Sequence, residues 1–258
     1  MTPTDTAASA AASTSGAPAA LPLFYRKPAA LQTEIHAGIS LKRKPDFGFA
    51  RETNAIPLTA AEFFAAQRHY PIVFTRDTPA VPLAVVGLRD GHNLFVDRAG
   101  QWRANTYVPA YVRRYPFLFA EDSGKGQLTL CVDEASGLIE TGDENPLFDT
   151  GGQAGAATRN ALDFCLSYQQ NHNATTEFSR ALVEAGLLVD RDARVNLRAE
   201  NFVLFRGFRM IDEEIFNRLS DETFLAWRRR GWVALVHAHL MSLGSWENLA
   251  SAALAEQG

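Results

Sequence analysis

Residues 81–88 read VPLAVVGL, and this apolar, β-branched run decides the fold class. Val85 and Val86 are adjacent, so on a strand they point to opposite faces, and both faces must be covered. The run therefore predicts a central β-strand. Further short strands separated by turn signals are predicted on both sides of it, at residues 72–74, 94–96, 101–103, 117–119 and 128–132. This spacing indicates an antiparallel meander or a small barrel.

The second half of the chain changes to a helical period. Apolar residues recur at helical spacing in two stretches, where Leu162, Cys165, Leu166 and Gln169 share one face and Phe178, Leu182 and Ala185 share another. Gly186 can end the second helix, and Asp212 and Ser220 are N-cap residues for helices at 213–219 and 221–243. The predicted class is α+β, with a β-rich first half and a helix-rich second half.

Composition divides the chain into four segments. Residues 1–22 are rich in Ala, Ser and Thr and are predicted to be disordered, because they bury too little apolar area to offset the entropy of ordering. Residues 23–133 form a predicted β-rich lobe, residues 134–157 an acidic, Gly-rich loop, and residues 158–258 a helix-rich lobe. We expect the two lobes to pack as one unit, since 258 residues fit one large domain.

The overall charge and cysteine content exclude several protein classes. A formal net charge of -4 argues against general nucleic-acid binding. Cys131 and Cys165 are too few for a disulfide framework or a four-thiolate zinc site. His237 and His239 would point apart on a helix, so we expect no metal, and no motif indicates an organic cofactor.

Membrane insertion and export are also not expected from the sequence. No stretch is apolar enough to span a membrane. The first basic residue is Arg26, and no apolar core of a secretory signal precedes it. The sequence therefore predicts a cytoplasmic protein.

The strongest candidate site is residues 107–117 (YVPAYVRRYPF), where aromatic residues alternate with arginines. The planar guanidinium group suits carboxylate and phosphate recognition. We predict that five residues line a ligand site: Tyr107, Tyr111, Arg113, Arg114 and Tyr115. The alternative is a rigid linker whose tyrosines pack on the core while its arginines meet acidic neighbours.

Asp133 and Glu134 follow the last predicted strand of the first half and are candidates for acid–base chemistry. The alternative is an ordinary acidic loop, because loops commonly carry solvated carboxylates.

Several different short motifs lie between residues 23 and 250 of the chain. They include residues 24–28 (FYRKP), 47–51 (FGFAR), 70–74 (YPIVF), 107–117 (YVPAYVRRYPF), 131–134 (CVDE) and 239–243 (HLMSL). Together and in this order, they resemble the SapC family of bacterial proteins. The name is shared with a peptide-transporter permease, which the absence of apolar spans excludes here.

The resemblance implies a component or accessory of the bacterial surface layer or cell envelope, and it supplies no catalytic residues. We therefore favour a non-enzymatic binding protein, which would be surface-associated if the family's role holds. The alternative is a cytoplasmic enzyme or enzyme accessory that holds an amino-acid or peptide carboxylate in the aromatic–arginine pocket. The expected partner is a protein or a small carboxylate or peptide ligand. The sequence is also compatible with a homo-oligomer.

Overall fold

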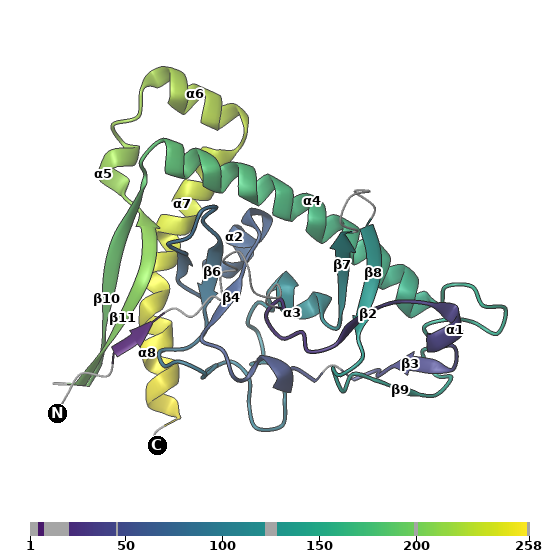
Figure 1. Cartoon of the computed structure of the whole chain (residues 1–258). Coiled ribbons are helices and arrows are strands. Elements are labelled where there is room, and N and C mark those ends of the chain that lie inside the picture. Colours follow the sequence, from purple (N-terminus) through teal and green to yellow (C-terminus); the bar gives the residue numbers. More distant parts are fainter. Residues whose placement is uncertain (1–4, 8–20, 45, 122–127, 199–200, 257–258) are drawn as a thin grey trace.

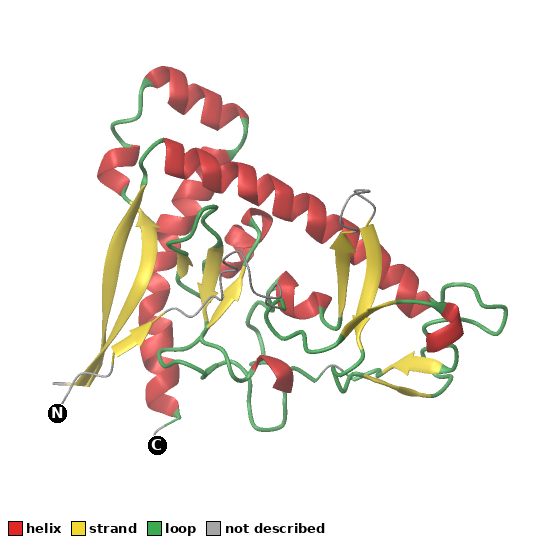
Figure 2. Cartoon of the chain, viewed as in Figure 1, coloured by secondary structure: helices red, strands yellow, loops and turns green. Residues whose placement is uncertain are grey.

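The computed structural model describes residues 5–7, 21–44, 46–121, 128–198 and 201–256, to which the structural statements below refer. Helices and strands both contribute, which confirms the predicted α+β class (Figure 2). The strands described pair in three separate sheets of six, three and two strands. The small-barrel alternative is therefore wrong, because no described sheet closes on itself.

The largest sheet is built around the predicted central strand, β6 (Pro82–Val85). It pairs antiparallel with both β4 (Ala55–Pro57) and β5 (Ile72–Phe74). All four residues of β6 are buried, so both faces of the strand are covered, as the sequence predicts. Burial of these apolar side chains on both faces stabilises the middle of the molecule.

The second half of the chain completes the same sheet. β10 (Leu188–Arg198) and β11 (Asn201–Ile211) form a long antiparallel hairpin. β11 also meets β5, where Arg209 lies opposite Phe74. Strands from both predicted lobes therefore share one sheet (Figure 1).

The N-terminal segment predicted to be disordered, residues 1–22, is described only in part. Residues 5–7 form β1 (Asp5–Ala7), which pairs parallel with β11. Residues 1–4 and 8–20 lie outside the described residues.

Two smaller sheets lie at the other end of the molecule (Figure 1). Their strands are β2 (Pro28–Ala30), β8 (Leu128–Asp133) and β7 (Phe117–Glu121) in one, and β3 (Ile39–Leu41) and β9 (Ile139–Thr141) in the other. The segment predicted to be an acidic loop, residues 134–157, thus contains a short strand.

The strands predicted at residues 94–96 and 101–103 do not form. These segments meet in a single bridge between Val96 and Trp102. The side chain of Asn93 accepts the hydrogen bond of the Phe95 amide, and Asp97 accepts from two further backbone amides. Side chains that bind nearby backbone in this way compete with a strand ladder.

Helix α4 (Ala156–Glu184) is 29 residues long and passes beside both the large sheet and the small sheets (Figure 1). The two helical stretches predicted here are one continuous helix, because no Gly or Pro interrupts it. The helix is followed by Gly186 with a φ of 68°, the predicted left-handed ending.

The C-terminal helices begin at the predicted caps. Asp212 accepts a hydrogen bond from the Ile215 amide, and Ser220 accepts one from the Thr223 amide. The helix predicted at 221–243 is interrupted at Gly231, whose φ is 75°. The helices not yet named are α1 (Thr33–His36), α2 (Phe63–Ala66), α3 (Ala110–Arg114), α5 (Glu213–Phe216), α6 (Asp221–Arg229), α7 (Trp232–Ser242) and α8 (Trp246–Ala255), with 3-10 turns η1 (Gly48–Ala50), η2 (Ala60–Glu62) and η3 (Leu243–Ser245).

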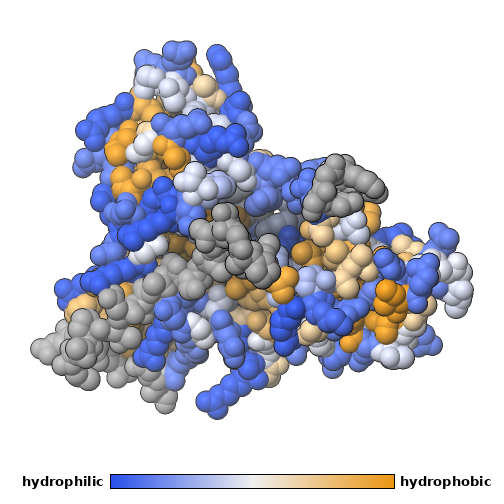
Figure 3. All heavy atoms as spheres, in the orientation of Figure 1, coloured by the Kyte–Doolittle hydropathy of each residue, from blue (hydrophilic) through white to orange (hydrophobic). Residues whose placement is uncertain are grey.

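The main core lies between the large sheet and the helices that pack on it. Its largest fully buried side chains include Phe63, Tyr70, Phe74, Phe178 and Phe205. On the face drawn in Figure 3, apolar residues show only in separate patches between hydrophilic ones. None of the helices in the described ranges is long and apolar enough to cross a membrane.

Candidate functional site

The predicted aromatic–arginine segment forms the short helix α3, whose start is fixed by a buried carboxylate. Glu62 accepts hydrogen bonds from the Ala110 amide (2.6 Å) and the Tyr107 hydroxyl (3.0 Å). It also accepts from the amide and hydroxyl of Thr59, which completes a capping box. Glu62 therefore positions α3, and with it the two arginines at the end of that helix.

The guanidinium of Arg114 lies among three tyrosine rings. Its Cζ atom is 4.3 Å from the ring centroid of Tyr168, 4.8 Å from that of Tyr111 and 5.7 Å from that of Tyr25. These distances are within the range of cation–π attraction. The rings come from α4, from α3 and from the segment before β2, so three parts of the chain converge on one cation.

Arg114 has no anionic neighbour in the described part of the chain. It forms no ion pair there, and its Nε atom is buried without a hydrogen-bond partner. Burial raises the pKa of both Tyr25 and Tyr168 above the usual range, although Arg114 itself acts to lower them. Burial also raises the pKa of the neighbouring Cys165 thiol to about 11. These groups are neutral near pH 7, so they leave the charge of Arg114 uncompensated.

Arg113 is more exposed and holds a different set of contacts. Its Nη2 atom donates to the Tyr107 hydroxyl at 3.1 Å, and its Nε atom donates to the Val108 carbonyl at 3.0 Å. Its Cζ atom lies 5.2 Å from the ring centroid of Phe164 on α4. Arg113 is therefore held in place without a carboxylate partner among the described residues.

Both arginines line one pocket of about 280 Å³, at the end of α3 and the first half of α4. Asn145 and Asn160 line it too, with Asn145 Nδ2 donating to the Leu41 carbonyl at 3.2 Å, and Phe117 and Phe164 add apolar surface. The described lining residues include no carboxylate. Two guanidinium groups with amide donors nearby suit a carboxylate or phosphate ligand.

Tyr115 links this site to the first predicted acid–base residue. Its hydroxyl donates to Asp133 Oδ2 at 2.9 Å, and its ring lies 4.2 Å from that of Phe49. Asp133 also accepts from the backbone amides of Arg26 (2.9 Å), Lys27 (2.8 Å) and Ala135 (3.1 Å). Burial favours a higher pKa for this carboxyl, but these hydrogen bonds outweigh burial and hold its pKa below the usual range.

Glu134 lies outside the pocket. Its carboxylate pairs with Lys27 at 2.7 Å and lies 3.6 Å from His36 Nε2. The structure thus joins Tyr115 to Asp133, whereas Glu134 contacts Lys27 and His36. A proton-transfer role for Asp133 or Glu134 stays a prediction.

Comparison with known proteins places the chain in a family. The family model for SapC matches residues 31–249, most of the chain. The protein belongs to the SapC family. The matched region contains α3, Asp133 and Tyr168 but not Tyr25. Neither the curated proteins nor the solved structures gave a match to this SapC-family chain.

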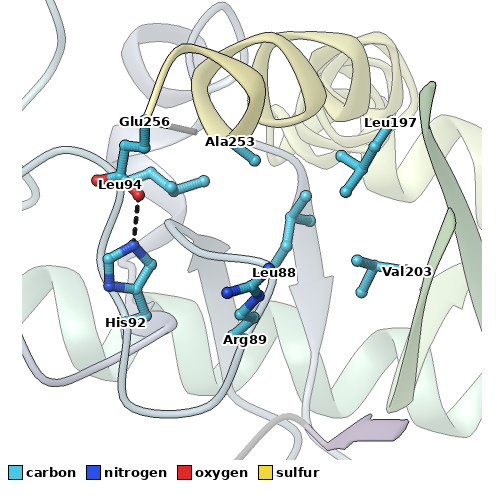
Figure 4. A pocket seen from close by; sticks show the side chains of 8 residues that line it. All are labelled: Leu88, Arg89, His92, Leu94, Leu197, Val203, Ala253 and Glu256. Carbon is cyan, nitrogen blue, oxygen red and sulfur yellow. Dashed lines mark hydrogen bonds and ion pairs between the residues drawn. The ribbon is translucent and has the colours of Figure 1, made fainter. Parts of the chain in front are cut away.

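Another pocket of this SapC-family protein carries its own carboxylate (Figure 4). It measures about 230 Å³ and lies between α8, the β10–β11 hairpin and the segment at residues 88–94. Leu88 and Val203 are among its apolar lining residues, and His92 Nε2 lies 2.7 Å from Glu256 Oε2. Here an acidic group is present within the pocket, in contrast to the pocket at Arg114.

The sequence identified the arginines of the candidate site but missed the partners that surround them. Tyr25, Glu62 and Tyr168 are distant in sequence and are brought in by the fold. One signal was available, since Phe164, Tyr168 and His172 are four residues apart and share one helix face. That aromatic face of α4 meets the arginines of α3.

Proposed function

We propose that this SapC-family protein binds a small ligand through a carboxylate, in the pocket formed by α3 and α4. The observation that carries the proposal is the buried edge of Arg114, which has neither an ion pair nor a hydrogen-bond partner for Nε among the described residues. A partly buried charge without a counterion is unfavourable, so an anion that enters the pocket gains a strong interaction with the Arg114 guanidinium.

The surrounding residues give the ligand its second property. Phe117 and Phe164 line the pocket with the arginines, so an apolar or aromatic group next to the carboxylate is favoured. An amino-acid or peptide carboxylate has this chemistry. Binding is favoured over catalysis because Asp133 already accepts four hydrogen bonds that hold the fold together.

The family's described role supports a place for this binding at the surface layer or cell envelope. In that setting, the carboxylate would belong to envelope material, and the protein would be an accessory rather than an enzyme. Fractionation of native cells tests this part separately. Recovery only in the cytoplasm, with no retention by envelope preparations, would overturn it and leave the carboxylate site as a property of a cytoplasmic protein.

Calorimetric titration tests the ligand class. The probes are N-acetyl-phenylalanine, which carries a carboxylate, and N-acetyl-phenylalaninamide, which does not. We expect the acid to bind at least about tenfold more tightly, since charge-assisted hydrogen bonds contribute about 1.5–3 kcal/mol each. Arg114→Gln should remove this preference. Equal binding of acid and amide by the wild-type protein would overturn the proposal.

Two further variants control for folding and for general charge effects. Arg113 is exposed, so Arg113→Gln should keep the fold and still weaken binding of the acid. Arg89→Gln, in the pocket of Figure 4, removes the same charge elsewhere and should leave binding unchanged. A loss of binding in Arg89→Gln as large as in Arg113→Gln would contradict a local site.

A further inference from the structure

A pocket distinct from that in Figure 4, called the second pocket below, adjoins the pocket at Arg114 across the end of α3. It measures about 230 Å³ and shares Leu41, Arg113, Tyr115 and Pro116 with the pocket at Arg114. Because four residues line both, the two pockets are adjacent. A ligand held at Arg114 can therefore extend into the neighbouring pocket.

The floor of this second pocket is aromatic and held by ring contacts. Phe47 and Phe49 line it together with Tyr115. The ring centroids of Phe49 and Tyr115 are 4.2 Å apart, and Phe47 packs edge-on against Trp102 at 5.9 Å. Rings fixed in this way offer an apolar surface at little further entropic cost.

The rim of the second pocket is cationic. Lys42, Arg43 and Lys44 line it together with Arg113. Arg43 pairs with Glu144 at 3.3 Å, whereas Lys42 and Lys44 have no ion pair in the described part of the chain.

One acidic residue, Asp46, is present among the described lining residues of this pocket. Its Oδ1 atom accepts a hydrogen bond from the Gly48 amide at 2.8 Å, which holds the turn into η1. The net charge along the rim is therefore positive, which suits an acidic ligand group.

We propose that this second pocket is a subsite for an acidic side chain, and that the ligand is a short acidic peptide. Its C-terminal carboxylate binds at Arg114. An apolar side chain packs on the aromatic residues that line the pockets, and the acidic side chain contacts Lys42 and Lys44. The inference rests on the proposed function, because it places the carboxylate of the same ligand at Arg114. It adds the requirement for a second negative charge.

Two peptides that differ in one charge test the subsite. N-acetyl-Glu-Phe and N-acetyl-Gln-Phe both carry the C-terminal carboxylate, and only the first carries the second charge. In titrations at low salt, we expect the wild-type protein to bind the Glu peptide about tenfold more tightly. In the double variant Lys42→Gln/Lys44→Gln, this preference should fall to about twofold or less, while the Gln peptide binds as before. Both lysines are exposed, so the fold should be kept.

The outcomes separate this inference from the proposed function. If the Gln peptide binds and depends on Arg114, but the Glu peptide has no advantage, the subsite is overturned and the carboxylate site stands. A Glu preference that survives in Lys42→Gln/Lys44→Gln also overturns the subsite. If neither peptide binds, both proposals fail. Arg89→Gln serves as the matched control and should keep the full preference for Glu.

Discussion

Two charged side chains, Asp133 and Arg114, lie near Tyr115 and have opposite surroundings. Asp133 is fully buried, and its oxygens accept from three backbone amides and the Tyr115 hydroxyl. Arg114 lies among neutral tyrosines, has a buried Nε without a partner and forms no ion pair in the described ranges. The chain itself satisfies the carboxylate of Asp133, whereas the Nε atom of Arg114 has no partner among the described residues.

The difference shows that the fold depends on the charge of Asp133, whereas the charge of Arg114 is available to a ligand. Removing Asp133 would leave several buried donors without an acceptor, which is costly to stability. Removing the charge of Arg114 leaves no partner carboxylate unpaired. A protein that keeps an uncompensated, partly buried arginine accepts a loss of stability, as functional sites often do.

The largest expected effect is on stability, from Asp133→Ala. The change leaves the Arg26 and Lys27 amides and the Tyr115 hydroxyl without their acceptor, so we expect a loss of about 3–5 kcal/mol in the free energy of unfolding. Urea denaturation at neutral pH measures it. Asp133→Asn keeps one acceptor oxygen and should lose less. A loss below about 1 kcal/mol for the alanine variant would contradict the view that Asp133, unlike Arg114, stabilises the fold.

Acid provides a second measure of how buried groups contribute to stability. His239 is fully buried, and its Nε2 atom accepts from the Ile211 amide at 3.1 Å. Burial lowers its pKa to about 3. The unfolded chain binds this proton below about pH 6.5 and the folded chain does not, so stability is full above that pH and falls as pH drops toward 3.

The expected slope from His239 is at most about 1.4 kcal/mol per pH unit. His239→Gln should flatten the dependence of unfolding free energy on pH between 6 and 4. Asp133, whose pKa is lowered, should then account for a further loss only below its usual pKa of about 3.9. An unchanged slope in His239→Gln would show that other groups control acid unfolding.

Local sequence signals predicted the elements whose cause is local. The central strand at 82–85 and the caps at Asp212 and Ser220 all depend on residues within a few positions. The packed face of α4 was harder to assign. Leu162 and Leu166 share a face with Cys165 by helical period, yet they are 40% and 41% exposed while Cys165 is buried.

In the candidate site, too, the sequence predicts the local features but not those that depend on tertiary packing. Arg113 and Arg114 could be identified because they are adjacent in a distinctive run, and adjacency needs no knowledge of the fold. The rings of Tyr25 and Tyr168 reach Arg114 only through tertiary packing, which no local pattern encodes. Lys42 and Lys44 belong to an exposed run of the kind that is usually solvated, and only the structure shows that they line a pocket with Arg113.

Arg114→Met is expected to change stability by about 1 kcal/mol or less, in either direction. The variant loses cation–π contacts but removes an uncompensated charge, and methionine can fill much of the space among the rings. Urea denaturation and titration with N-acetyl-phenylalanine should show near-normal stability with loss of binding. A stability loss above about 3 kcal/mol would mean that Arg114 holds the fold together as Asp133 does.

The smallest effect is a shift in the titration of His172, which reports on Arg114 directly. His172 stacks on Tyr168, with ring centroids 6.4 Å apart. Its pKa is lowered by burial and, to a lesser extent, by the charge of Arg114. A bound carboxylate would offset that charge, so the pKa of His172 should rise when N-acetyl-phenylalanine binds, and NMR titration of the histidine ring protons would measure it. The rise should be absent with N-acetyl-phenylalaninamide, because an amide carries no charge. A pKa that stays fixed when the acid binds would place the ligand away from Arg114, even if the affinity depends on charge.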